Sequence, residues 1–214
     1  VITPVTRLPR PGETLLIDDV RLANGGKGAN AAVAAARLGG TVTFVGAVGD
    51  DAFGRVIRQG LEANGIDCAH LATVEGGSGT AVILLEKASG QNSILVGPGA
   101  NARFGLPDDD ALWQAADALM LQLETPLPIN IEAARRARAA GARVVLDPAP
   151  APTDLPEELL GCSDLVSPNE TELATLTGRS VDSRDEAETA ARALLDCGAR
   201  EVVVKLGATG ALWV

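Results

Sequence analysis

Residues 118–146, ALMLQLETPLPINIEAARRARAAGARVVL, decide the fold class of this chain. Their pattern predicts a strand over 118–123, a helix over 129–140 and a second strand over 143–146. The same alternation continues on both sides, with strands at 41–45, 165–166 and 201–205 and helices at 51–64, from 170, and at 186–197. Strands that alternate with helices favour a mainly parallel sheet covered by helices on both faces, which is an α/β fold.

Two segments interrupt this alternation. Residues 13–23 and 80–96 predict hairpin strands without a helix between them, and Pro11-Gly12 and Ser89-Gly90 supply turn residues. We expect them to form a small accessory sheet beside one domain that comprises residues 1–214. Asp108-Asp109-Asp110, which follows Pro107, indicates a helix start rather than a metal site.

The composition excludes several classes of partner. The chain of 214 residues has a net charge of −10, no basic run, two Trp, three Phe and no Tyr, which argues against nucleic-acid binding. No stretch approaches the ~20 apolar residues of a membrane span. No apolar segment of a signal peptide follows Arg7 and Arg10. The three cysteines, Cys68, Cys162 and Cys197, are widely spaced, which fits the cytoplasm.

The hexapeptide Gly25-Gly26-Lys27-Gly28-Ala29-Asn30 precedes an alanine-rich helical run over 31–38. Its glycines leave backbone amides accessible to a small polyhydroxylated ligand, and the helix directs its N–H groups and positive dipole end to the same place. Asn30 can both donate and accept a hydrogen bond, which suits a sugar hydroxyl. Glycine pairs also serve as tight connections, so the glycines alone leave both interpretations open.

Glu124 follows the first strand of the opening stretch, directly before Thr125-Pro126. Ligands of open α/β sheets bind beyond the carboxyl ends of the strands, so a carboxylate there is well placed for binding. A solvated acid at a strand end is an equally good interpretation of this residue alone. The prolines of residues 147–151, DPAPA, indicate a stiff loop after the next strand rather than chemistry.

Residues 167–172, SPNETE, open a predicted helix on which Asn169 and Glu172 share a face. An amide and a carboxylate placed in this way can hold a hydrated Mg²⁺ against nucleotide phosphates. A capping arrangement is the alternative, and the residues by themselves favour it. Residues 205–210, KLGATG, lead from a strand end into a glycine turn, for which a hairpin is the simplest interpretation.

In order and spacing, these segments resemble the ribokinase-like (PfkB) family of carbohydrate kinases over nearly the whole chain. The resemblance runs from residues 11–14, PGET, through GGKGAN, LQLE at 121–124 and PNETE at 168–172 to Gly210, with DPAPA standing where the family has Asn-Pro-Ala-Pro-Ala. It implies a three-layer α/β/α sandwich with a mainly parallel central sheet and a small β-lid at about 13–23 and 80–96. In this family the lid covers the sugar and often pairs with the lid of another subunit, which implies a homodimer.

The resemblance also implies ATP-dependent phosphorylation of a sugar, and the details are most similar to the kinases that convert D-ribose to D-ribose 5-phosphate. It assigns the sugar to Gly26, Lys27, Gly28, Asn30 and Glu124. It assigns ATP to Asn169, Lys205, Gly207 and Gly210, and Mg²⁺ to Glu172 through water. The alternatives are another kinase of the family, acting on a different sugar or a nucleoside, and a non-catalytic sugar-binding protein.

Some parts that the resemblance leads one to expect do not occur between Val1 and Val214. They are the Asp-Thr-x-Gly-Ala-Gly-Asp motif with the catalytic base, a Gly-x-x-Asn-x-Asp sugar contact, and the site of a monovalent cation, K⁺. The chain starts on Val rather than Met, and residues 211–214 read as an unfinished strand. We therefore expect truncation at both ends, a base downstream of Val214, and little or no kinase activity from these residues alone.

Overall fold

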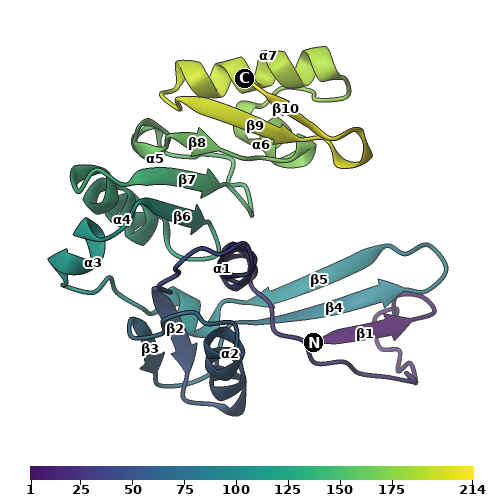
Figure 1. Cartoon of the computed structure of the whole chain (residues 1–214). Helices are drawn as coiled ribbons and strands as arrows, with labels where there is room; N and C mark the ends of the chain where they lie inside the picture. The colour runs from purple at the N-terminus through teal and green to yellow at the C-terminus, as the bar shows by residue number, and fades with distance from the viewer. The chain divides into compact units, whose positions relative to one another are not determined.

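The computed structural model describes all residues from Val1 to Val214, and their contacts divide the chain into two compact units. These units are Val1–Phe104 and Gly105–Val214 (Figure 1). Each unit has a hydrophobic core of its own.

The Gly105–Val214 unit is built on a five-stranded sheet with the strand order β10-β9-β8-β7-β6 (Figure 1). Its strands are β6 (Ala118–Gln122), β7 (Arg143–Asp147), β8 (Leu165–Val166), β9 (Glu201–Lys205) and β10 (Ala211–Trp213). Strands β6 to β9 are parallel, and β10 runs antiparallel to β9. The mainly parallel sheet expected from the sequence is confirmed, with the strands within one residue of their predicted ends.

The helices of this unit begin and end at residues suited to those positions. They are α3 (Asp110–Gln114), α4 (Leu127–Ala139), α5 (Glu157–Cys162), α6 (Glu170–Thr177) and α7 (Arg184–Asp196), with a 3₁₀ turn η2 (Gly207–Thr209). The Asp109 side chain accepts a hydrogen bond from the Ala111 amide, which confirms the helix start expected at the three aspartates. Gly178 ends α6 in the left-handed region, at φ 64°, where glycine carries no steric penalty.

One face of the sheet carries the core of this unit. Val144 and Leu146 of β7 and Val202 and Val204 of β9 are fully buried, because every second side chain of a strand points to the same face. The helices that pack on this sheet present small side chains, which allows close approach: Ala133, Ala134 and Ala137 of α4, and Ala187, Ala190 and Ala191 of α7. The strand ends, where polar side chains gather, are thus held on a rigid support.

The Val1–Phe104 unit contains two smaller sheets. Its elements are β1 (Ile2–Val5), α1 (Lys27–Arg37), β2 (Gly46–Gly49), α2 (Ala52–Glu62), β3 (Leu71–Val74), β4 (Thr80–Glu86), β5 (Asn92–Gly97) and the 3₁₀ turn η1 (Gly99–Ala102). One sheet has the order β1-β4-β5, and the other is the parallel pair of β2 and β3. The hairpin expected over 80–96 is confirmed, because β4 and β5 pair antiparallel.

Two strand predictions in this unit differ from the structure. Residues 13–23 form no strand; within them only Arg21 makes an isolated bridge, to Ile2. All of its residues except the half-buried Leu15 are exposed, so a second strand has little to pack against. The strand predicted over 41–45 lies at Gly46–Gly49 instead, and only Thr43 of the predicted range makes a bridge, to Asp67.

Neither unit contains a helix with the length and apolar character needed to cross a lipid bilayer. The longest helices, α4 and α7, have 13 residues each and carry several charged side chains.

Candidate functional site

The carboxyl ends of β7, β8 and β9 bring a lysine and two carboxylates together. Lys205 ends β9, and its Nζ donates a hydrogen bond to Oδ1 of Asp147, the last residue of β7, at 3.1 Å. The Oε2 atom of Glu172, at the start of α6, lies 3.8 Å from the same Nζ. This edge of a parallel sheet is where α/β proteins bind their ligands, so the cluster is the candidate site of this unit.

Asn169 and Glu172 form a complete capping box at the start of α6. The Asn169 Oδ1 atom accepts from the Glu172 amide at 2.8 Å, and Glu172 Oε2 accepts from the Asn169 amide at 2.8 Å. The capping interpretation of the sequence is therefore present in the structure. It uses one side-chain oxygen of each residue, so the Asn169 Nδ2 and the Glu172 Oε1 atoms remain available to a ligand.

The backbone fixes this box against β9. The Lys205 amide donates to the Pro168 carbonyl at 2.8 Å, and Asn169 forms a parallel bridge with Lys205. The residues predicted to bind the nucleotide, Asn169 and Lys205, are thus neighbours although they lie far apart in the sequence. Both are held by main-chain hydrogen bonds.

The turn after β9 contains two glycines in conformations that favour glycine. Gly207 has φ 54° and Gly210 has φ 99°, and the Leu206 amide donates to the Gly210 carbonyl at 2.8 Å. The turn leads into β10, so the hairpin expected as the simplest interpretation is formed. A Cβ atom added at either glycine would meet nothing within 4 Å, so the backbone of this turn is open on that side.

Glu124 lies in the turn between β6 and α4, at the same edge of the sheet as Lys205. Strand β6 is separated from β9 by two strands, so the two positions are about 14 Å apart along the sheet. Glu124 is therefore not part of the Lys205 cluster. It lies at a separate place on the same edge, which leaves room for a different part of a substrate.

The other predicted binding residues lie in the Val1–Phe104 unit, at the start of α1. The helix begins at Lys27, inside the glycine motif and four residues earlier than expected, because Gly26 has φ 94° and breaks the regular backbone. No side chain caps this helix, and its first turn has no acidic residue. The amides of Gly28 and Ala29 therefore point out of the helix end without a side-chain cap.

A cavity of about 410 Å³ lies between α1 and α2. Asn30 of the predicted sugar-binding set lines it, together with Asn24, Gly25 and Asn64, whereas Lys27 and Gly28 do not. The amide side chains around this cavity supply both donors and acceptors, which is the chemistry that hydroxyl groups need.

A partly buried polar network anchors α2, which forms one wall of this cavity. The Asp51 Oδ1 atom accepts from the Gly54 amide at 2.7 Å and from the Ser78 hydroxyl at 2.7 Å, and Oδ2 accepts from the Ser78 amide at 3.0 Å. These hydrogen bonds, first that of the Ser78 hydroxyl, lower the pKa of Asp51 to about 2. The carboxylate thus holds the start of α2 to the loop at Ser78.

Asp147 is the residue of the site that the sequence did not reveal. The prolines after it indicated a stiff loop, and the structure places its carboxylate in an ion pair with Lys205. A usable signal was present, because Asp147 directly follows the strand predicted over 143–146, as Glu124 directly follows the strand predicted over 118–123. The partner, 58 residues further along the chain, follows only from the strand order.

Comparisons with known proteins identify the family of the chain. The model of the pfkB family of carbohydrate kinases matches residues 1–214. The ribokinase of Haemophilus influenzae is 41% identical over 213 residues, which cover 98% of this chain and 69% of that protein. The deoxyribokinase of Salmonella typhi is 38% identical over 220 residues, which cover 100% of this chain and 71% of that protein.

Among solved structures, that of Arabidopsis thaliana ribokinase complexed with ribose and ATP has a TM-score of 0.89 at 35% identity, covering 99% of this chain and 70% of the other. The fold is therefore the ribokinase-like α/β fold expected from the sequence. The family match over every residue, the identity to curated relatives and the strand-edge site lead to one conclusion. This chain belongs to the pfkB family of carbohydrate kinases.

Proposed function

We propose that the protein containing this chain is an ATP-dependent ribokinase, which converts D-ribose to D-ribose 5-phosphate. The observation that supports this most strongly is the likeness to the Arabidopsis ribokinase complexed with ribose and ATP, at a TM-score of 0.89. The identity of 41% to the Haemophilus influenzae ribokinase supports the same substrate. Transfer of a phosphoryl group requires that the acceptor is positioned and that the charge on the phosphates is neutralised.

In this proposal the nucleotide binds at the carboxyl ends of β8 and β9. Lys205 provides a positive charge for the phosphates, and Asn169 donates from its free Nδ2 atom. Gly207 and Gly210 let the nucleotide approach the main chain, because no side chain covers the turn. The ion pair of Lys205 with Asp147 keeps the ammonium group in place before the nucleotide binds.

The magnesium ion that accompanies ATP is assigned to Glu172 through water. No group of three or more His, Cys, Asp or Glu side chains in the chain is arranged to hold a metal ion. A single carboxylate fits Mg²⁺ that is held mainly by phosphates and water, and the Glu172 Oε1 atom has no hydrogen bond within the protein. We extend the proposal to activation by K⁺.

The sugar is assigned to Gly26, Lys27, Gly28 and Asn30 at the start of α1 and to Glu124 beyond β6. The Gly28 and Ala29 amides, the Asn30 amide group and the Glu124 carboxylate supply donors and acceptors for several hydroxyl groups. Gly26, Lys27, Gly28 and Asn30 belong to the Val1–Phe104 unit, and Glu124 belongs to the Gly105–Val214 unit.

We assign the lid role to the sheet of β1, β4 and β5 and propose that it forms a homodimer contact. Leu95 is 69% exposed on one face of β5 and Ile94 and Val96 are exposed on the other, and exposed apolar side chains favour burial against a second copy. Size-exclusion chromatography with light scattering tests this, and Leu95→Glu should shift a dimer to a monomer. We further place the protein in the cytoplasm, where ATP is available and free thiols such as those of its three cysteines persist.

The experiment is sugar-dependent ADP release by the full-length protein, with D-ribose, 2-deoxy-D-ribose and D-fructose compared by kcat/KM. We expect the highest value for D-ribose. The second candidate is a deoxyribokinase, which the 38% identity to the Salmonella typhi enzyme favours, and a higher value for 2-deoxy-D-ribose would support it. Loss of activity on replacing K⁺ by Na⁺ in the same assay would support the cation assignment.

A further inference from the structure

Three arginines surround a second cavity, at the edge of the five-stranded sheet opposite the candidate site. The cavity has a volume of about 510 Å³ and is lined by Arg138, Gly141, Ala142, Arg143, Asp164, Arg200 and Glu201. Arg143 and Glu201 are the first residues of β7 and β9, and Asp164 directly precedes β8. This is the amino edge of the parallel strands. None of the residues assigned to ATP or to the sugar lies there.

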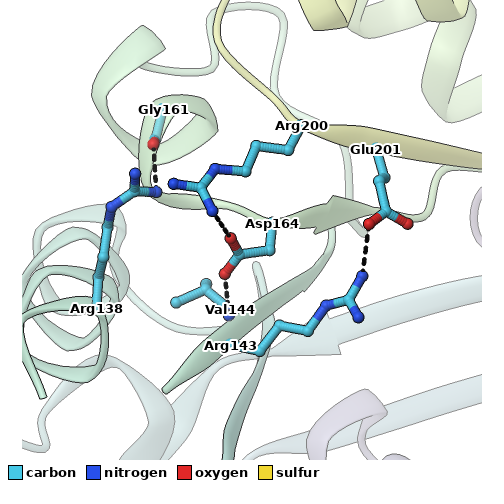
Figure 2. Close-up of polar contacts among 7 residues, drawn as sticks. All are labelled: Arg138, Arg143, Val144, Gly161, Asp164, Arg200 and Glu201. Atoms are coloured by element: carbon cyan, nitrogen blue, oxygen red, sulfur yellow. Dashed lines mark hydrogen bonds and ion pairs between the residues drawn. The ribbon is translucent and has the colours of Figure 1, made fainter. Parts of the chain in front are cut away.

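Two of the arginines are held by carboxylates (Figure 2). The Arg200 Nη1 atom donates to Asp164 Oδ1 at 2.8 Å, and the Arg143 Nη2 atom donates to Glu201 Oε1 at 2.7 Å. Asp164 also accepts from the Val144 amide through its other oxygen, at 2.8 Å. The Asp164 side chain is 14% exposed and that of Arg200 is 60% exposed, so the guanidinium group lies over the carboxylate and faces solvent.

Arg138 has no carboxylate partner. Its Nη1 atom donates to the Gly161 carbonyl at 2.9 Å, which is a neutral acceptor, and no acidic side chain lies within 4.0 Å of its guanidinium nitrogens. Figure 2 shows the guanidinium groups of Arg138 and Arg200 turned toward the same space beside Gly161. The carboxylates that line the cavity compensate two of its three positive charges, and one remains.

The three arginines also have N–H donors that are not used within the protein. A guanidinium group has five N–H donors, and one donor atom of each arginine is used in these contacts, so several donors of each face the cavity or solvent. The contacts that are made fix the position of each group. A set of fixed guanidinium groups with unused donors is the arrangement that binds oxyanions, because the planar fork matches the geometry of a phosphate.

A purely structural role explains only part of the cluster. The two ion pairs can join the starts of β7, β8 and β9, and Arg138, in the last turn of α4, caps the end of α5 through Gly161. These roles use one donor atom of each arginine and leave the remaining donors unexplained. The excess of positive charge is local, since the chain as a whole carries a net charge of −10. We propose that this cavity binds a small oxyanion, either inorganic phosphate or the phosphate group of a phosphorylated small molecule.

The test is isothermal titration of the full-length protein with inorganic phosphate, pyrophosphate and a sugar phosphate at constant ionic strength. Arg138→Gln should weaken the binding of pyrophosphate by about tenfold, because one charge-assisted contact is lost. The same substitution gives up only one hydrogen bond to a backbone carbonyl, so the variant should fold, and a thermal melt checks this. Arg179→Gln is the matched control, because Arg179 is exposed in the same unit but does not line the cavity.

Lys205→Gln separates this cavity from the candidate nucleotide site. We expect it to leave the pyrophosphate binding that depends on Arg138 unchanged. Wild-type affinity in Arg138→Gln would overturn the proposal, and so would loss of all pyrophosphate binding in Lys205→Gln. Tighter binding of the sugar phosphate than of inorganic phosphate would identify a phosphorylated small molecule as the ligand, and equal affinities would identify the free ion.

Discussion

The Nζ atom of Lys205 lies 3.1 Å from Oδ1 of Asp147, which joins the last residues of β9 and β7. Their side chains are 43% and 38% exposed, and a pair so accessible to water contributes at most about 1 kcal/mol to stability. A large effect of either residue on activity would therefore report on ligand binding rather than on folding.

Lys205→Gln should raise the KM for ATP by about tenfold, because it removes a charged donor to the phosphates. The KM for the sugar and the melting temperature should change little. Lys87→Gln is the control, since Lys87 also forms an exposed ion pair, with Asp18 at 2.8 Å. An unchanged KM for ATP in Lys205→Gln would remove this residue from the nucleotide site.

Substitutions of Glu172 separate its capping role from its role toward Mg²⁺. Glu172→Gln keeps an oxygen that accepts from the Asn169 amide, so stability should stay near that of the wild type. The Mg²⁺ concentration for half-maximal activity should rise by about tenfold, because the charge is lost. Glu172→Ala should in addition destabilise the protein by about 1 kcal/mol. If both variants keep the wild-type Mg²⁺ dependence, Glu172 acts only as a cap.

Gly26→Ala should destabilise the protein by about 1–3 kcal/mol, because Gly26 has φ 94°, where a side chain is strained. Gly25→Ala is a matched control in the same motif, since a Cβ atom there would meet nothing within 4 Å. Urea denaturation of both variants measures the difference. Equal stabilities would contradict the backbone conformation at the start of α1.

Asp51→Asn tests the polar network behind α2. The folded pKa of Asp51, about 2, lies below its ordinary value of 3.8, so the unfolded chain binds more protons between these two values. The stability that the carboxylate provides is present above pH 4 and is lost as the pH falls toward 2. Asparagine can still cap α2 but carries no charge. The difference in unfolding free energy between wild type and Asp51→Asn should therefore shrink as the pH falls from 4 to 2. A difference that stays constant over this range would contradict the lowered pKa of Asp51.

The long periodic segments were predictable because local pattern and tertiary packing agree in them. The strand and helix signals of residues 118–146 correspond to β6, α4 and β7, whose apolar positions form the core of their unit. Residues 41–45 show the opposite case. Their β-branched side chains favoured a strand, but the pairing with β3 uses Gly46–Gly49, in which every residue is buried. A Cβ atom at Gly49 would lie 2.1 Å from the Gly76 carbonyl oxygen, a constraint that no local propensity contains.

The candidate site was predictable residue by residue, but not in its contacts. Asn169 and Glu172 lie three residues apart, so their capping box follows from helical spacing. The contact of Lys205 with Asp147 depends on which strands are neighbours in the sheet, and the sequence does not state that order. Arg138, Arg143 and Arg200 come together for the same reason.

Steady-state kinetics of the full-length protein with D-ribose test most directly whether Asn30 and Glu124 each bind the sugar. Asn30→Ala and Glu124→Ala should each raise the KM for D-ribose by at least about tenfold and leave the KM for ATP within about twofold. Gln59→Ala, which removes an exposed amide from α2, should change neither. Wild-type KM values for D-ribose in both Asn30→Ala and Glu124→Ala would contradict the account.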